Sequence, residues 1–258
     1  MLASICYKAN MIKAIFIDMD DTLIVNQVLF DNAKAMLCGY LRSFGILPDE
    51  ALKVFDKKDA ELFKTYGRTP QRLILSFEAT LKHFVPQADA EMLSIVQEQA
   101  QSVFTTVADV KPGVAEAIEM LAKHYPIYIV TGGVKDVQEF RFKHIPFMDK
   151  ISGTLIVDDK TEQTYKDALK KWNLKPEETV MIGDSLSTDI FPAVAAGLQA
   201  VWIEAHNSAY ETKTGFPAKN AFKFSSLLEM ARSLVLHKSQ LVAPYTPAEP
   251  KQPVRKFG

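Results

Sequence analysis

The sequence predicts an α/β fold in which a doubly wound parallel sheet carries an inserted helical domain. Two observations support this class: short apolar runs recur with helical patterns between them, and the stretch 25–107 shows helical spacing alone. Strands that alternate with helices are typical of βαβ units and therefore of a parallel sheet. We expect the core to comprise residues 11–24 and 108–238, the helical insert 25–107, and an extended tail 239–258.

The first strand is expected at 14–17, where AIFI is too short for a helix and does not alternate with polar residues. Such a run is typical of a strand that is buried on both faces. Similar runs follow at 127–130, 155–157, 179–182 and 200–203. Helical patterns lie between the later runs, for example at 113–124 and 161–172.

The insert is expected to hold roughly four helices, because its apolar residues recur at helical intervals and no strand-like run interrupts them. Pro48 and Pro70 suit the first position of a helix, and Gly45 and Gly67 suit helix ends. The final segment, 239–258, carries four prolines and little apolar periodicity, so we expect it to lie outside the core.

The composition is that of a globular protein, with 48% hydrophobic and 24% charged residues. A formal charge of −1 gives no indication of a nucleic-acid partner, and no apolar run approaches the ~18–20 residues needed to span a membrane. Cys6 and Cys38 cannot form a disulfide framework, and the first residues lack a signal-peptide layout, so we expect a cytoplasmic protein. The sequence leaves the oligomeric state open.

Polar residues follow four of the expected strands, at the point where each strand ends. In chain order they are Asp18, Asp20 and Asp21, then 131–133 (TGG), then Lys160, and then 183–185 (GDS) with Asp189. Because parallel strands present their carboxyl ends at one edge of the sheet, and ligands bind there, we expect these residues to meet.

These residue types indicate phosphoryl transfer. Asp18 and Asp20 are two positions apart, so their side chains can share one side and form a metal site, an acid–base pair, or both. Mg²⁺ prefers oxygen ligands, and Asp184 could complete such a set. Thr131 offers a hydroxyl beside glycine amides that suit phosphate oxygens, and Lys160 would neutralise the remaining charge.

At these positions the sequence resembles the haloacid dehalogenase superfamily of phosphohydrolases. Residues 18–23 (DMDDTL) resemble its first motif, and 131–133, Lys160 and 183–189 (GDSLSTD) resemble the second, third and fourth, in order. Two further segments, 131–142 and 196–207, are similar to the branch that contains small phosphatases and nucleotidases. The resemblance covers residues 12–207 and implies a Rossmann-like core with a helical cap of the C1 type.

The resemblance implies a role for each motif residue. Asp18 would be the nucleophile that forms an aspartyl-phosphate, and Asp20 would be the general acid and then the general base. Thr131 and the Gly132 amide would bind the transferring phosphoryl group. Lys160 would pair with Asp18 and with the phosphate.

The same resemblance implies a Mg²⁺ site. Its ligands would be the carboxylates of Asp18 and Asp184 and the backbone carbonyl of Asp20. Asp189 would be a further ligand or would hold a metal-bound water.

Two positions depart from the pattern of that branch. Gly132 stands where asparagine is common, although the backbone amide is retained, and Lys160 is followed by Thr161 in place of the frequent proline. Lys166 is therefore a rival for the third motif. We favour Lys160 because it lies at the expected turn between a strand and a helix.

We therefore predict a Mg²⁺-dependent hydrolase of phosphoric monoesters that acts on a small soluble substrate such as a nucleotide or sugar phosphate. A C–halogen hydrolase of the same superfamily is an alternative, but that reaction needs no general acid, and Asp20 argues against it. A phosphomutase is a second alternative. A non-catalytic scaffold of the same fold is the third, and the complete set of acids argues against it.

Overall fold

The computed structural model describes residues 11–204, 215–217 and 219–241, and it confirms the predicted α/β fold. Its centre is a six-stranded sheet in the order β3-β2-β1-β4-β5-β6, with every neighbouring pair parallel. The strands are β1 (Ala14–Ile17), β2 (Ile127–Gly132), β3 (Gly153–Val157), β4 (Thr179–Gly183), β5 (Gln199–Ile203) and β6 (Ala221–Phe224). The first five were predicted; β6 was not, because its four residues include Lys223 and form no apolar run.

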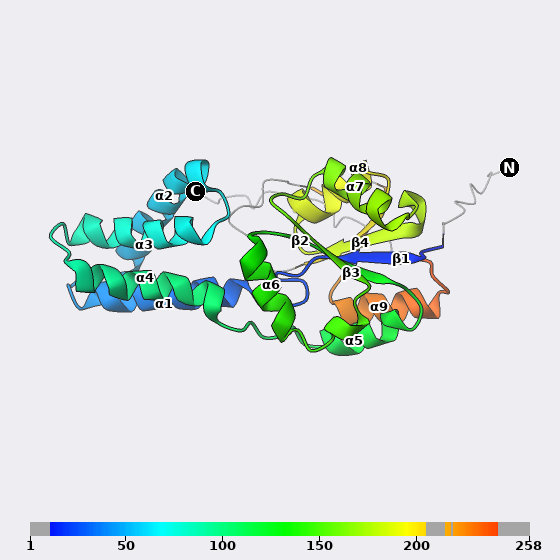
Figure 1. The fold of residues 1–258 in the computed structure, drawn as a ribbon, viewed down its shortest axis with the longest axis horizontal. Coiled ribbons are helices and arrows are strands. Elements are labelled where there is room, and N and C mark those ends of the chain that lie inside the picture. Colours follow the sequence, from blue (N-terminus) through cyan, green and yellow to red (C-terminus); the bar gives the residue numbers. More distant parts are fainter. Residues whose placement is uncertain (1–10, 205–214, 218, 242–258) are drawn as a thin grey trace, which may run out of the picture.

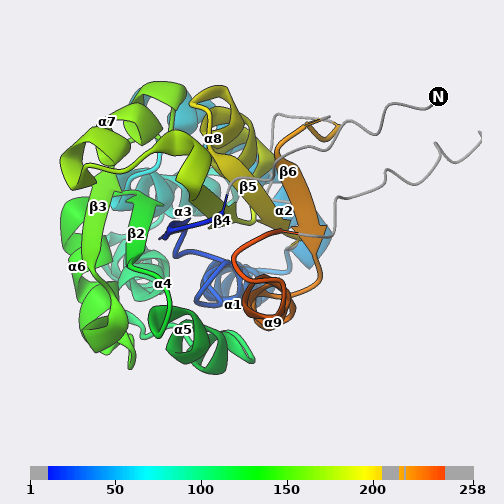
Figure 2. The ribbon, with the colours of Figure 1, turned by 90° about the vertical axis from the view of Figure 1, so that its right-hand side faces the viewer.

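Helices cover both faces of the sheet, as Figure 2 shows. One face packs against α5 (Val114–Ala122) and α9 (Leu227–Leu236), and the other against α7 (Glu162–Trp172) and α8 (Phe191–Ala195). Alternate residues of β1 serve the two layers, since Ile15 and Ile17 belong to the first hydrophobic cluster and Phe16 to the second. This explains why β1 is apolar at every position.

The insert after β1 is a bundle of four helices, which we call the cap. They are α1 (Gln27–Arg42), α2 (Pro48–Tyr66), α3 (Pro70–Phe84) and α4 (Ala90–Thr105). Pro48 and Pro70 occupy first helical positions, as predicted. The cap has its own hydrophobic cluster, in which the rings of Phe55 and Phe77 meet edge to face at 5.5 Å.

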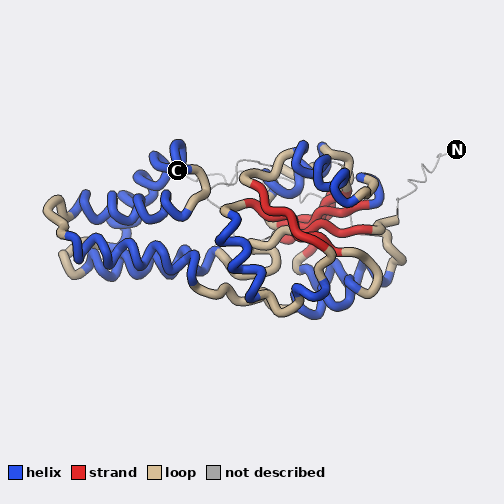
Figure 3. Tube along the Cα trace, in the orientation of Figure 1, coloured by secondary structure: helices blue, strands red, loops and turns tan. Residues whose placement is uncertain are grey.

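The cap lies beyond the carboxyl ends of the central strands, and α6 (Lys135–His144) lies beside the junction (Figures 1 and 3). The two connecting segments are paired with each other. Val25 donates its backbone N–H to Asp109, Lys111 donates to Leu23, and Ile24 bridges Val110 in antiparallel fashion. The chain also forms two short 3₁₀ helices, Met148–Lys150 and Pro176–Glu178, and a π-helical segment, η3 (Leu186–Ile190).

The end of the described chain packs against the core. Leu241 is buried in the cluster with α5 and α9, and the Ser239 carbonyl accepts a bond of 2.8 Å from Ile12. The described residues do not include Cys6, the end of the segment 196–207, or residues 242–258 of the predicted tail. Within the described ranges, no helix has the length and apolar character needed to cross a membrane.

The cap cluster gives a first prediction. Phe77→Ala should lower the free energy of unfolding by about 3–5 kcal/mol, because a fully buried ring is lost and a cavity remains. Urea unfolding followed by circular dichroism measures this loss. Met36→Ala, at a side chain 42% exposed on the same bundle, is the control and should change stability by less than about 0.5 kcal/mol. Equal effects of the two substitutions would contradict the assignment of Phe77 to a packed core.

Candidate active site

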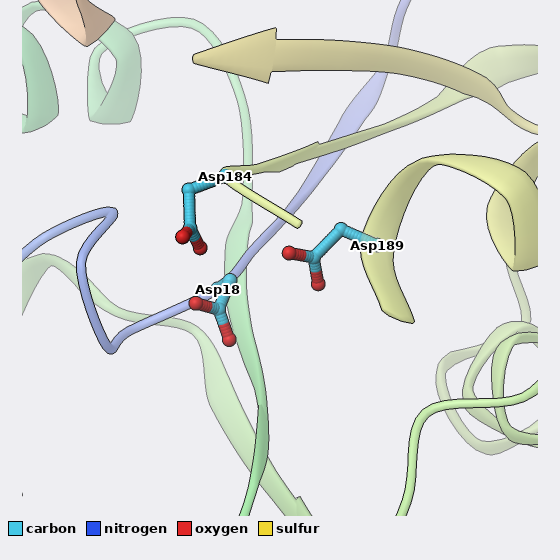
Figure 4. A group of neighbouring side chains, drawn as sticks. All are labelled: Asp18, Asp184 and Asp189. Atoms are coloured by element: carbon cyan, nitrogen blue, oxygen red, sulfur yellow. The ribbon is translucent and has the colours of Figure 1, made fainter. Parts of the chain in front are cut away.

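Three carboxylates from distant parts of the chain converge at the carboxyl edge of the sheet (Figure 4). Asp18 follows β1, Asp184 follows β4, and Asp189 lies in η3. One oxygen from each lies within 4.8 Å of the others. This convergence was expected because parallel strands present their carboxyl ends at one edge of the sheet. In the structure β1 and β4 are neighbours, and the backbone N–H of Asp18 extends their pairing by donating to Ile182 at 2.9 Å.

Lys160 joins this group, whereas Lys166 does not. The Lys160 ammonium donates to Asp18 Oδ1 at 2.5 Å and also to Asp189 Oδ1, and its side chain is 5% exposed. Lys160 lies in the turn between β3 and α7, as predicted. Lys166 is half exposed on α7 and pairs with Glu162. The lysine beside the acids is therefore Lys160.

Burial controls the electrostatics of the cluster. It raises the pKa of Asp18 well above the ordinary range of a carboxyl, although the Lys160 charge acts in the opposite direction. Burial and the nearby Asp189 carboxylate raise the pKa of Asp184 to about 7. Burial also opposes the charge of Lys160, but the carboxylates of Asp18 and Asp189 outweigh it and raise the pKa of that lysine. One ammonium thus offsets only part of the negative charge.

Gly183 is required where η3 folds back on β4. A Cβ at this residue would lie 2.3 Å from the Asp189 carboxyl carbon, far inside van der Waals contact. The Ser185 backbone N–H holds Asp189 Oδ2 at 3.0 Å. Behind it, the fully buried Tyr165 donates its hydroxyl to the Thr188 carbonyl at 3.0 Å.

Asp184 is oriented by two neighbours. Thr22 donates its hydroxyl to Asp184 Oδ1 at 3.3 Å, and the indole N–H of Trp202 donates to the Asp184 backbone carbonyl at 2.6 Å. Thr22 therefore has a structural role beside the acids.

The side chain of Asp20 is bound by two residues of α6. Arg141 Nη1 donates to its Oδ1 at 2.6 Å, and Gln138 Nε2 donates to its Oδ2 at 3.0 Å. The carboxylate of Asp20 is thus outside the group formed by Asp18, Asp184 and Asp189.

Thr131 and Gly132 end β2 beside the acids. Thr131 is fully buried, and Gln138 Nε2 lies 3.2 Å from its hydroxyl and 2.7 Å from the Gly132 carbonyl. Gln138 and Arg141 belong to the segment 131–142 that carried the resemblance, but sequence reasoning gave them no role. The feature that could have revealed them is their separation by three residues, which places both side chains on one side of a helix. Asn26, which accepts from Arg141 at 2.7 Å, carries no sequence signal of its own.

The donor set fits a hard divalent cation. Mg²⁺ takes oxygen ligands, and three carboxylate oxygens lie together with a negative charge that Lys160 offsets only in part. Asp18, Asp184 and Asp189 are therefore suitable ligands for such an ion.

A model of the haloacid dehalogenase-like hydrolase family matches residues 12–197 of this chain. The chain belongs to this family. The match confirms the superfamily that the four motifs indicated, and it makes this protein a hydrolase.

Of two curated relatives of this hydrolase, one is named a phosphatase and the other a nucleotidase. A glyceraldehyde 3-phosphate phosphatase of Pyrococcus furiosus is 27% identical over 200 residues, which cover 75% of this chain and 81% of the relative. A pyrimidine 5′-nucleotidase of Streptococcus pneumoniae is 23% identical over 245 residues, which cover 88% of this chain and 98% of the relative.

Solved structures support the fold of the hydrolase. A haloacid dehalogenase-like family hydrolase from Xanthomonas campestris superposes with a TM-score of 0.72 at 22% identity, over 89% of this chain and 97% of that one. The L-2-haloacid dehalogenase of Xanthobacter autotrophicus superposes with a TM-score of 0.61 at 17% identity, over 87% of this chain and 99% of that one. At these identities the likeness concerns the fold alone.

The position of Lys160 gives a second prediction. In the metal-free protein, Lys160→Met should lower the free energy of unfolding by about 3–5 kcal/mol, because two buried carboxylates lose their partner. Lys166→Met is the matched control and should change it by no more than about 1 kcal/mol, since its pair is half exposed. Chemical denaturation measures both values. If the Lys166 variant were the less stable of the two, the buried pairing of Lys160 would be refuted.

Proposed function

We propose that this chain, a phosphomonoester hydrolase of the haloacid dehalogenase-like family, cleaves small phosphate esters with Mg²⁺ through a phosphorylated Asp18. The main support is the meeting of the Asp18 carboxylate with Asp184, Asp189 and Lys160 at one buried sheet edge. A carboxylate beside a lysine and two further acids is suited to attack a phosphoryl group whose charge the site can neutralise.

Asp18 carries the covalent step in this proposal. Its carboxylate attacks phosphorus, the bond between phosphorus and the ester oxygen breaks, and the alcohol leaves. Lys160 holds Asp18 Oδ1 and fixes the orientation of the attacking group. Water then attacks the aspartyl-phosphate, which releases inorganic phosphate and restores the carboxylate.

Asp20 moves the protons. It gives a proton to the leaving oxygen as the ester bond breaks, and it takes a proton from the water that attacks the aspartyl-phosphate. The separate surroundings of its carboxylate support this role, because Arg141 and Gln138 hold it apart from the three clustered acids.

The phosphoryl group would be bound by Thr131, the Gly132 amide and Lys160. Asp18, Asp184 and Asp189, with the Asp20 carbonyl, would hold Mg²⁺, which supplies positive charge for the phosphoryl oxygens when it is bound. Asp184 is prepared for such a ligand role by its bonds from Thr22 and Trp202.

A small substrate is favoured by two considerations. The named activities of the curated relatives concern a triose phosphate and pyrimidine nucleotides. The cap lies over the edge of the sheet that carries the acids, and a lid in this place excludes bulky partners and water. A nucleotide or sugar phosphate is therefore the proposed substrate class, while the presence of Asp20 argues against C–halogen hydrolysis.

The nucleophile assignment predicts the behaviour of Asp18→Asn. This variant should have no measurable turnover of p-nitrophenyl phosphate, because an amide cannot form the aspartyl-phosphate, and its fold should be intact by circular dichroism. Wild-type enzyme incubated with phosphate ester and quenched in acid should carry phosphate on the peptide that contains Asp18. Turnover by the variant would remove this assignment.

The acid–base assignment predicts that Asp20→Asn slows both formation and breakdown of the phospho-enzyme, by about 10²–10⁴. Rapid-quench measurement of the two steps tests this. Wild-type rates in the variant with a poor leaving group would contradict the role of Asp20.

The metal assignment predicts that Mg²⁺ raises the midpoint temperature of unfolding of the wild-type protein and that EDTA abolishes turnover. Asp184→Asn should reduce both the thermal shift and the activity, because one charged ligand is lost. Differential scanning fluorimetry measures the shift separately from catalysis. A well-folded wild-type protein with no Mg²⁺-dependent turnover would favour the non-catalytic scaffold.

A further inference from the structure

The carboxylate of Asp20 is held at both of its oxygens by one helix. Arg141 occupies Oδ1 at 2.6 Å and Gln138 occupies Oδ2 at 3.0 Å. The Arg141 side chain is only 7% exposed, and that of Asp20 is 23% exposed. Attachment at both oxygens, to a nearly buried guanidinium and to an amide, restricts the rotamers of a short side chain far more than a single surface bond does.

The helix that supplies these donors is itself attached to the phosphate-binding motif. Gln138 and Arg141 are three residues apart on α6 and therefore lie on one side of it. Gln138 Nε2 also donates to the Gly132 carbonyl at 2.7 Å, and Arg141 Nη1 lies 3.3 Å from Gln138 Oε1. The position of Asp20 is thus fixed relative to the end of β2.

The second arm of the Arg141 guanidinium reaches the start of the cap. Its Nη2 donates to Asn26 Oδ1 at 2.7 Å, directly before α1. Asp21 places Asn26 there, since its Oδ1 accepts the backbone N–H groups of Asn26 and Gln27 at 2.9 Å each. Asp21 adopts a left-handed φ of 59° to make this turn.

We propose that Arg141 is a positioning residue that holds Asp20 for proton transfer and connects it to the first cap helix through Asn26. The inference rests on the proposed function, since it assigns a partner to the acid–base residue. A guanidinium suits the task because its planar fork can donate to two acceptors at once, whereas a lysine ammonium lacks this fixed geometry. Proton transfer depends on placement, and a displacement of about 1 Å can cost ~10²-fold in rate.

The experiment compares kcat/KM for phenyl phosphate and p-nitrophenyl phosphate, two esters of similar shape with a poor and a good leaving group. This parameter reports the steps up to phosphoryl transfer, where a poor leaving group needs the proton from Asp20. Arg141→Met should lower kcat/KM by about 10²-fold for phenyl phosphate and by a clearly smaller factor for the nitrophenyl ester. Lys143→Met, at an exposed position on the same helix, is the matched control and should leave both values unchanged.

Two milder variants keep the test informative if Arg141→Met folds poorly. Arg141→Lys keeps the charge and should recover part of the loss. Asn26→Ala removes the connection to the cap while Asp20 and Arg141 remain paired, and it should give a smaller loss with the same dependence on the leaving group. A uniform loss with both esters in these variants would overturn the proposal.

A double-mutant cycle with Asp20→Asn separates this inference from the proposed function. If Arg141 acts through Asp20, then Arg141→Met should lower kcat/KM for phenyl phosphate far less in the Asp20→Asn background than in the wild type. Equal factors in both backgrounds would assign Arg141 a general structural role and overturn the inference alone. An Asp20→Asn variant with wild-type rates would overturn the acid–base role of Asp20 and the inference with it.

Discussion

The Lys160 ammonium is the contact on which the rest of the site depends, because it lies between the buried carboxylates of Asp18 and Asp189. Burial, and to a smaller extent repulsion by the neighbouring Asp189 carboxylate, raises the pKa of Asp18. The Lys160 ammonium offsets part of the negative charge of Asp18 and Asp189. It offsets the charge of the third acid, Asp184, only weakly, and the pKa of Asp184 stays raised. The same deficit of positive charge suits the site to a divalent cation, which would in turn offset the charge of a phosphate ester.

The parallel topology explains how motifs so far apart in the chain meet. With β1 between β2 and β4, the ends of these three strands place Asp18, Thr131 and Asp184 side by side. The insertion of the cap directly after β1 has a second consequence. Helix α1 begins at Gln27, only a few residues after Asp20. A side chain that contacts Asp20 is therefore close to the junction between the core and the cap. Arg141 makes use of this proximity by bonding to both Asp20 and Asn26.

Much of this arrangement could be predicted from the sequence because buried parallel strands and their terminal acids leave strong local patterns. The five longer apolar runs, the four cap helices and the preference for Lys160 over Lys166 all follow from such patterns. β6 could not be predicted, since a strand of four residues with Lys223 at its third position is defined by its pairing with β5. The partners of Asp20 were missed for a related reason: Arg141 is 121 positions away, and only the packing of α6 against the end of β2 brings them together.

Asp18 and Asp20 are chemically identical residues in different surroundings, and this difference supports the different roles proposed for them. They are two positions apart, yet Asp18 is nearly buried among acids and a lysine, while Asp20 is bound by neutral and cationic donors on a separate helix. A nucleophile needs a fixed, ionised carboxylate next to the phosphoryl group, whereas a group that gives and takes protons needs access to the leaving oxygen and to water. The partial exposure of Asp20 meets the second need. The bond from Lys160 serves the first, because it fixes the Asp18 carboxylate and favours its ionised form against the effect of burial on the pKa. Both residues lie in the segment that follows β1, so the difference in their surroundings comes from the elements that pack against them. For Asp20 that element is α6, which supplies Gln138 and Arg141.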